Sequence, residues 1–84
     1  MSDPRDLERV LAALHAAAEE VAGKPVKPVS VAYDWLSEAT GGSPVVEARI
    51  TRATRTLVFL EADLAHGGRP ALSATAVFRI IEDR

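Results

Sequence analysis

The chain has 84 residues, a formal net charge of −2 at pH 7, 48% hydrophobic residues and no cysteine. A chain of this length forms a single domain and buries only about 60% of its unfolded surface, so oligomerisation is expected to add stability. The composition argues against disulfides, cysteine metal sites, a broad nucleic-acid surface and a membrane span. We therefore expect a cytoplasmic protein with neither nucleic-acid nor membrane partners, because the acidic N-terminus is unlike a secretory signal.

The first quarter of the chain has the periodicity of one amphipathic helix, expected over about residues 4–22. Apolar residues recur along one face at steps of three and four. They are Leu7, Val10, Leu11, Leu14, Ala18 and Val21. Asp3 can cap the first turn, where Pro4 is well tolerated, and Gly23 can end the helix. This apolar stripe needs a sheet, alone or together with a second copy of the molecule, to cover it.

The rest of the chain alternates apolar and polar residues with the period of half-buried strands. Four strands are expected at about residues 29–36, 44–52, 56–65 and 69–81. Their short connections favour antiparallel pairing, and His66-Gly67-Gly68 is the clearest hairpin turn, with His66 expected in solvent. The predicted fold class is α+β, one long helix packed on a four-stranded antiparallel sheet, in a single domain over residues 1–84.

Four stretches, in this order along the chain, resemble the hotdog-fold thioesterase superfamily, in which an antiparallel sheet wraps a central helix. Val10 to Leu14 resembles the central helix in composition, and Val29 to Leu36 looks like the strand that follows it. Val45 to Ile50 is similar to the next strand, and Ala74 to Phe78 is similar to the last one. The resemblance implies a hotdog-like fold.

The chain departs from the family pattern around the helix and at one turn. Related proteins usually have a strand and a loop before the helix, often ending in His-Gly-Gly, whereas Met1 and Ser2 alone precede the cap here. The resemblance therefore implies a minimal or N-terminally truncated member. Thr54 stands where the family's R-x-G-R turn has its glycine, and His15 lies nearest by spacing to an acid that many members carry in the helix.

The resemblance also implies a ligand and candidate catalytic residues. Acyl-CoA or a related acyl thioester would bind at a subunit interface of a homodimer or dimer of dimers, and no resident cofactor is expected. Asp34 could orient a water there, or could simply discourage unwanted pairing at an edge strand. His15 could act as a base beside Glu8 and Glu19, or could be a boundary histidine that interacts with Glu19 one turn away.

Two arginines near a turn are candidates for the phosphates of coenzyme A. Arg52 and Arg55 fit this role because a guanidinium group binds phosphate in a bidentate way. Arg49 is instead expected to pair with carboxylates across the strands. The sequence shows neither a nucleophilic constellation nor the spacing of metal ligands.

Three interpretations remain open. The first is a small hotdog protein that binds acyl-CoA, with hydrolysis of the thioester as an open question. The second is a non-catalytic hotdog-like module for dimerisation or partner binding. The third is a cystatin-like α+β fold, which shares the layer of helix on sheet, although the inhibitory Q-x-V-x-G pattern of that family is absent.

Overall fold

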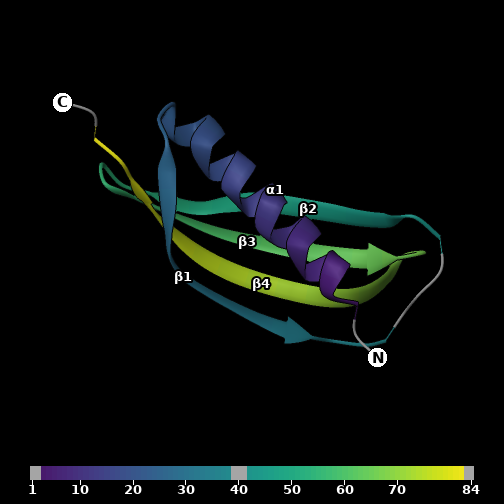
Figure 1. Cartoon of the computed structure of the whole chain (residues 1–84). Coiled ribbons are helices and arrows are strands. Elements are labelled where there is room, and N and C mark those ends of the chain that lie inside the picture. Colours follow the sequence, from purple (N-terminus) through teal and green to yellow (C-terminus); the bar gives the residue numbers. More distant parts are fainter. Residues whose placement is uncertain (1–2, 39–41, 83–84) are drawn as a thin grey trace.

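The structure is a computed structural model that describes residues 3–38 and 42–82. Its elements are α1 (Pro4–Ala22), β1 (Val26–Trp35), β2 (Pro44–Ala53), β3 (Leu57–His66) and β4 (Arg69–Ile80). The strands form one antiparallel sheet in the order β1-β4-β3-β2, and α1 lies across one face (Figure 1). The predicted fold class is thus confirmed. The two residues before the helix cap, on which the expectation of a truncated member depends, lie outside the described residues.

Both ends of α1 are set by local hydrogen bonds. The Asp3 carboxylate accepts the Arg5 N–H at 2.9 Å, and Pro4 occupies the first turn, where no N–H is needed. At the other end Gly23 adopts a left-handed conformation with φ of 67°, and its N–H donates to the Glu19 carbonyl. The helix therefore begins and ends where its sequence signals predict.

The buried face of α1 differs from the predicted apolar stripe. The buried helix residues are Asp6, Val10, Leu14 and Ala18, one every four positions. Leu11 and Val21 were predicted in the stripe but are 36% and 49% exposed. A single sheet covers mainly one row of side chains spaced by four, because such a row forms a continuous ridge along a helix. This row places Asp6, a charged residue, in the buried layer.

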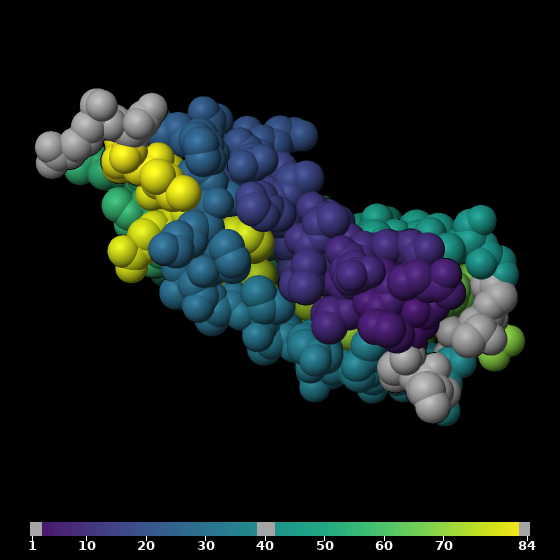
Figure 2. All heavy atoms as spheres, viewed as in Figure 1, coloured from purple at the N-terminus to yellow at the C-terminus, as the bar shows by residue number. Residues whose placement is uncertain are grey.

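The helix-facing side of β3 and β4 supplies the other half of the core. The buried residues there are Val58, Leu60, Ala62, Leu64, Ala71, Leu72, Ala74, Ala76 and Phe78. Ala62 and Ala74 are opposite each other in the register, which keeps the middle of the sheet thin under the helix. Figure 2 shows atoms of β4 between β1 and α1, so in this view the helix leaves part of the sheet uncovered towards β1.

Strand β1 starts earlier than the alternation predicts. It begins at Val26 and includes Pro28, whereas the predicted strand begins near residue 29. An edge strand tolerates proline because the missing N–H is needed by no neighbour on the open side. The register then shifts between Pro28 and Ser30, so Val29 is an extra residue in a β-bulge, and β1 changes direction along its length (Figure 1).

The other edge strand, β2, has a matching irregularity. Its register with β3 shifts between Ile50 and Arg52, which makes Thr51 the extra residue. Val29 and Thr51 lie towards the same end of the sheet. Ser30, which follows the first shift, is opposite Val77 of β4. Arg52, which follows the second shift, is opposite Phe59, and Phe59 is in turn opposite Val77. A bulge reverses which side of the sheet the following side chains face. Both edge strands therefore reverse their alternation at this end.

Candidate functional site

A buried hydrogen-bonded pair joins the start of α1 to the end of β3. Asp6 Oδ2 lies 2.8 Å from His66 Nε2, and Asp6 Oδ1 accepts a hydrogen bond of 2.8 Å from the Arg9 guanidinium. The Asp6 and His66 side chains are only 6% and 11% exposed. These two residues are 60 positions apart in the sequence, so the contact depends on the tertiary fold.

His66 reaches this position because it ends a strand. Gly67 and Gly68 alone form the turn, with φ of 57° and 82°, as two-residue hairpin turns require. The prediction that His66 lies in solvent is therefore wrong. Period-two alternation in β3 puts His66 on the same side as the buried Leu64, facing α1. Continuing this alternation to the end of the strand would have predicted that His66 is buried.

The pair is closed to a substrate in this arrangement. Both carboxylate oxygens of Asp6 are occupied by donors, and His66 Nδ1 is buried without a hydrogen-bond partner in the described part of the chain. An acid or base must reach the proton that it transfers. The geometry instead suits an anchor that fixes the first turn of α1 on the sheet, where the helix dipole also favours a carboxylate.

The backbone amides at the start of α1 are also occupied. The Arg5 N–H donates to the Asp3 carboxylate, and the Asp6 N–H donates to the Asp3 carbonyl oxygen at 2.9 Å. The Arg5 side chain also donates to the Asp3 carboxylate, and these hydrogen bonds lower the pKa of Asp3. The helix start is therefore capped from within the chain.

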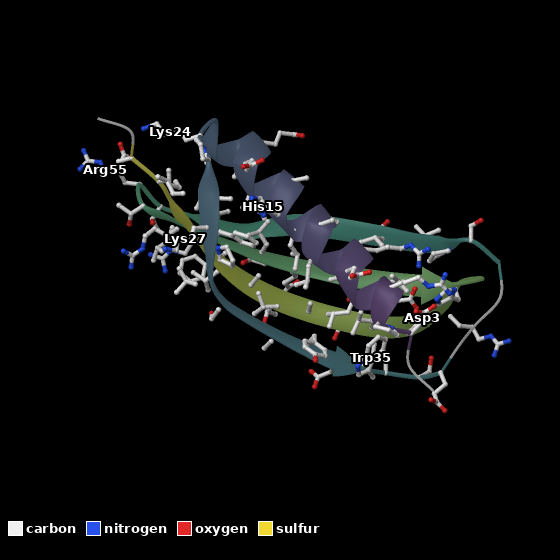
Figure 3. All side chains as sticks on the ribbon, viewed as in Figure 1. Asp3, His15, Lys24, Lys27, Trp35 and Arg55 are labelled. Carbon is white, nitrogen blue, oxygen red and sulfur yellow. The ribbon has the colours of Figure 1, made fainter. Side chains whose placement is uncertain are left out.

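The two predicted catalytic residues lie on different faces of the sheet. The His15 ring packs 5.4 Å from Phe78 on the helix side, with its Nε2 atom 3.4 Å from Glu19 (Figure 3). Asp34 lies opposite Ser73 on the outer side, away from α1. Ser73 and Phe78 are five residues apart on β4, which corresponds to about 17 Å. One subunit therefore does not bring His15 and Asp34 together.

Arg49 forms the predicted cross-strand ion pairs. Its Nε donates to Glu61 at 3.1 Å, and a terminal nitrogen donates to Asp63 at 2.8 Å. The hydrogen bond to Asp63 is the main reason that the pKa of Arg49 is raised. Arg52 and Arg55 are exposed and form no ion pair within residues 3–38 and 42–82.

The β1 edge of the sheet is open and partly apolar. Val29, Tyr33 and Leu36 are 53%, 46% and 53% exposed. Tyr33 lies on the helix side, opposite Ala74, and meets Trp35 edge to face with ring centroids 6.3 Å apart. Because β1 has β4 as its only neighbour in the described sheet, its other side can pair with a further strand.

Among the described residues, no cluster of histidine or acidic side chains could hold a metal ion. Within the same residues, no helix combines the length and the apolar character that crossing a membrane requires.

The fold closely matches solved structures of low sequence identity. A Bacillus halodurans protein whose crystal structure was determined with CoA aligns with a TM-score of 0.81 at 13% identity, over 89% of this chain and 52% of that one. A hexameric thioesterase from Yersinia pestis aligns with a TM-score of 0.79 at 17% identity, over 92% and 69%. A Chromobacterium violaceum protein aligns with a TM-score of 0.78 at 14% identity, over 92% and 60%.

The chain thus spans about half the length of the Bacillus halodurans protein. No curated protein matches the sequence. The family model of the acyl-CoA thioesterase N-terminal domain matches residues 10–79, which include most of α1 and nearly all of the sheet. The chain belongs to this acyl-CoA thioesterase family and has the hotdog fold of its structural relatives.

Proposed function

We propose that this protein binds acyl-CoA or a related acyl thioester at an interface between two subunits and hydrolyses it. The observation that carries the proposal is the open β1 edge, where Tyr33 lies on the helix side of the sheet without cover from α1. Membership of a thioesterase family supports the reaction, and the Bacillus halodurans structure with CoA supports the ligand.

Pairing of two β1 strands would continue the sheet from one subunit into the next. Such pairing satisfies the free backbone groups of both edges and brings two sets of exposed apolar side chains together. Tyr33 and Trp35 would then contribute to a shared apolar surface on the helix side that suits an acyl chain. A chain of this size also gains stability from a dimer, because its own core is small.

Hydrolysis requires a base that takes a proton from water while the water oxygen attacks the thioester carbonyl carbon and the thiol leaves. Asp34 and His15 are the candidate bases, and their separation means that each acts without the other in one subunit. Both side chains are accessible, in contrast to Asp6. Arg52 and Arg55 are the candidates for binding the phosphates of CoA.

The test is an assay of the wild-type protein with acyl-CoA substrates of different chain lengths, beside Asp34→Ala and His15→Ala. Loss of a general base is expected to lower kcat at least a hundredfold in one of the two variants. Absence of turnover, or unchanged turnover in both variants, overturns hydrolysis by these residues. Light scattering after size exclusion should show a dimer or larger assembly, and a monomer at micromolar concentration contradicts the shared interface.

A second candidate is a non-catalytic module that binds a partner or an acyl thioester without turnover. The capped helix start favours it, because the Arg5 and Asp6 amides already donate to Asp3 and are not free to polarise a thioester carbonyl. Binding of acyl-CoA without release of free thiol would support this second function.

A further inference from the structure

Four basic side chains gather at the end of the molecule that lies away from the start of α1. They are Lys27, Arg52, Arg55 and Arg79, and all are exposed. In the described part of the chain none of them forms an ion pair, whereas Lys24 beside them holds Glu82 at 3.1 Å. Figure 3 shows Lys27 and Arg55 at this end, opposite the end that carries Asp3 and Trp35.

The two β-bulges turn two of these cations towards the outer face of the sheet. Without the bulge at Val29, Lys27 would share the helix side with Val31; with it, Lys27 lies opposite Arg79 on the outer side. Without the bulge at Thr51, Arg52 would follow Ile50 to the helix side; instead it lies opposite Phe59 on the outer side. Bulges commonly re-aim side chains at functional sites.

Lys27 and Arg79 are direct register partners on neighbouring antiparallel strands. Like charges placed opposite each other in this way destabilise a sheet. Together with Pro28 and Val29 they line a groove of about 280 Å³. Along the outer face of β3, the first described carboxylate after Leu57, which is opposite Arg79, is that of Glu61. Glu61 already accepts a hydrogen bond from Arg49. An anion from outside the chain would relieve the repulsion.

The surface between the cations is apolar. Leu57, Phe59 and Val77 face outwards and are half-buried, with Leu57 opposite Arg79 and Phe59 opposite Val77 and Arg52. Phe59 and Val77 also line a second groove of about 340 Å³ next to the first. An apolar floor with cations around it suits a phosphate ester with an attached ring better than it suits a free inorganic ion.

We propose that this outer-face cluster binds the phosphorylated adenosine end of a CoA thioester, with Lys27 and Arg79 as the principal phosphate ligands. Arg52 adds a third cation from β2, and Phe59 contacts the base. The assignment of the ligand depends on the proposed function, whereas the preference for a phosphate ester depends only on the cluster. The proposed function has Arg52 and Arg55, near the β2–β3 turn, as the phosphate ligands. The outer-face cluster extends this phosphate site to β1 and β4.

The experiment compares Arg79→Ala with Arg69→Ala, because Arg69 is an exposed arginine of the same strand at its other end. Calorimetry measures binding of CoA, adenosine 3′,5′-bisphosphate and pantetheine, the part of CoA that lacks the nucleotide. Loss of a charged hydrogen bond is expected to weaken binding of CoA and the bisphosphate about tenfold to a hundredfold in Arg79→Ala and in Lys27→Ala. Arg69→Ala is expected to bind both as the wild type does, and pantetheine binding should stay unchanged in all variants.

Equal binding of the bisphosphate by the wild type and by both cation variants overturns the proposal, as does equal weakening in Arg69→Ala. Acyl-pantetheine, which carries no adenosine phosphates, separates this outcome from failure of the proposed function. Turnover of acyl-pantetheine with no effect of Lys27→Ala on the KM for acyl-CoA retains the function and removes the phosphate site. Bisphosphate binding that needs Lys27 and Arg79, without any thioester turnover, retains the site and removes hydrolysis.

Discussion

The two ends of the elongated molecule, which measures 46 × 19 × 19 Å, treat charge in opposite ways. At the helix-start end, Asp6 is buried between Arg9 and His66, and both of its oxygens accept hydrogen bonds. At the other end, Lys27 and Arg79 lie side by side in solvent, and within the described residues neither forms an ion pair with a carboxylate. The charges at the helix-start end stabilise the fold, whereas those of Lys27 and Arg79 are available to bind a ligand.

This difference has an energetic basis. Removal of one member of a buried charged pair strands its partner away from water, which costs far more than the pair contributes. Removal of an exposed cation leaves water to take its place. The helix-start end should therefore respond to substitution through stability, and the other end through ligand binding.

The largest expected effect is that of Asp6→Ala. The substitution leaves His66 Nε2 without its acceptor and removes a carboxylate from the start of α1, so we expect a loss of about 2 to 3 kcal/mol in the free energy of unfolding. Urea denaturation followed by circular dichroism measures it. Asp6→Asn is the matched control, because it keeps the shape and should lose less. A loss below about 0.5 kcal/mol for Asp6→Ala would show that the pair is no anchor.

A double-mutant cycle separates the two contacts of Asp6. The coupling energy between Asp6 and His66 is expected to be about 1 to 2 kcal/mol, because the two side chains are almost fully buried. The coupling between Asp6 and Arg9 should be near 0.5 kcal/mol, because the Arg9 side chain is 47% exposed. Equal couplings would mean that His66 contributes no more than a surface partner.

The architecture could be predicted from the sequence because it depends on local signals. Alternation and turn glycines locate the strands, and the cap residues Asp3 and Gly23 locate the helix. The cross-strand pairing of Arg49 also followed, because it depends only on strand register. The early start of β1 did not follow, because tolerance of Pro28 depends on β1 being an edge strand.

The candidate site was harder to predict because its parts meet only in the folded chain. Asp6 occupies the same spacing-of-four row as Val10, but a search for apolar residues passes over a carboxylate. His66 continues the buried parity of β3, although it was expected in the hairpin turn. The bulges at Val29 and Thr51 carry no simple sequence signal, so plain alternation gives the wrong side of the sheet for Lys27 and Arg52.

The basic end should be nearly insensitive in stability. Lys27→Ala and Arg79→Ala are expected to change the free energy of unfolding by less than about 0.5 kcal/mol, because both side chains are exposed. Lys27→Glu should raise stability slightly, because an opposite charge would then face Arg79 across the strands. Urea denaturation at low salt tests these values. A loss above about 1 kcal/mol in either alanine variant would indicate a structural role and weaken the case for a ligand.

The smallest effect should be a pH dependence at the cap of α1. The pKa of Asp3 is lowered in the folded chain by hydrogen bonds from Arg5, so its contribution is complete above the ordinary value of 3.8 and disappears as the pH falls through the lowered pKa. Asp3→Ala should therefore have a lower Tm than the wild type at pH 7, and the gap should narrow as the pH falls below 3.8. High salt should narrow it too, because the Arg5 contact is exposed. A gap that stays constant with pH would mean that the Asp3 contribution does not depend on its ionisation, and that the cap stabilises α1 by its shape and not by its charge.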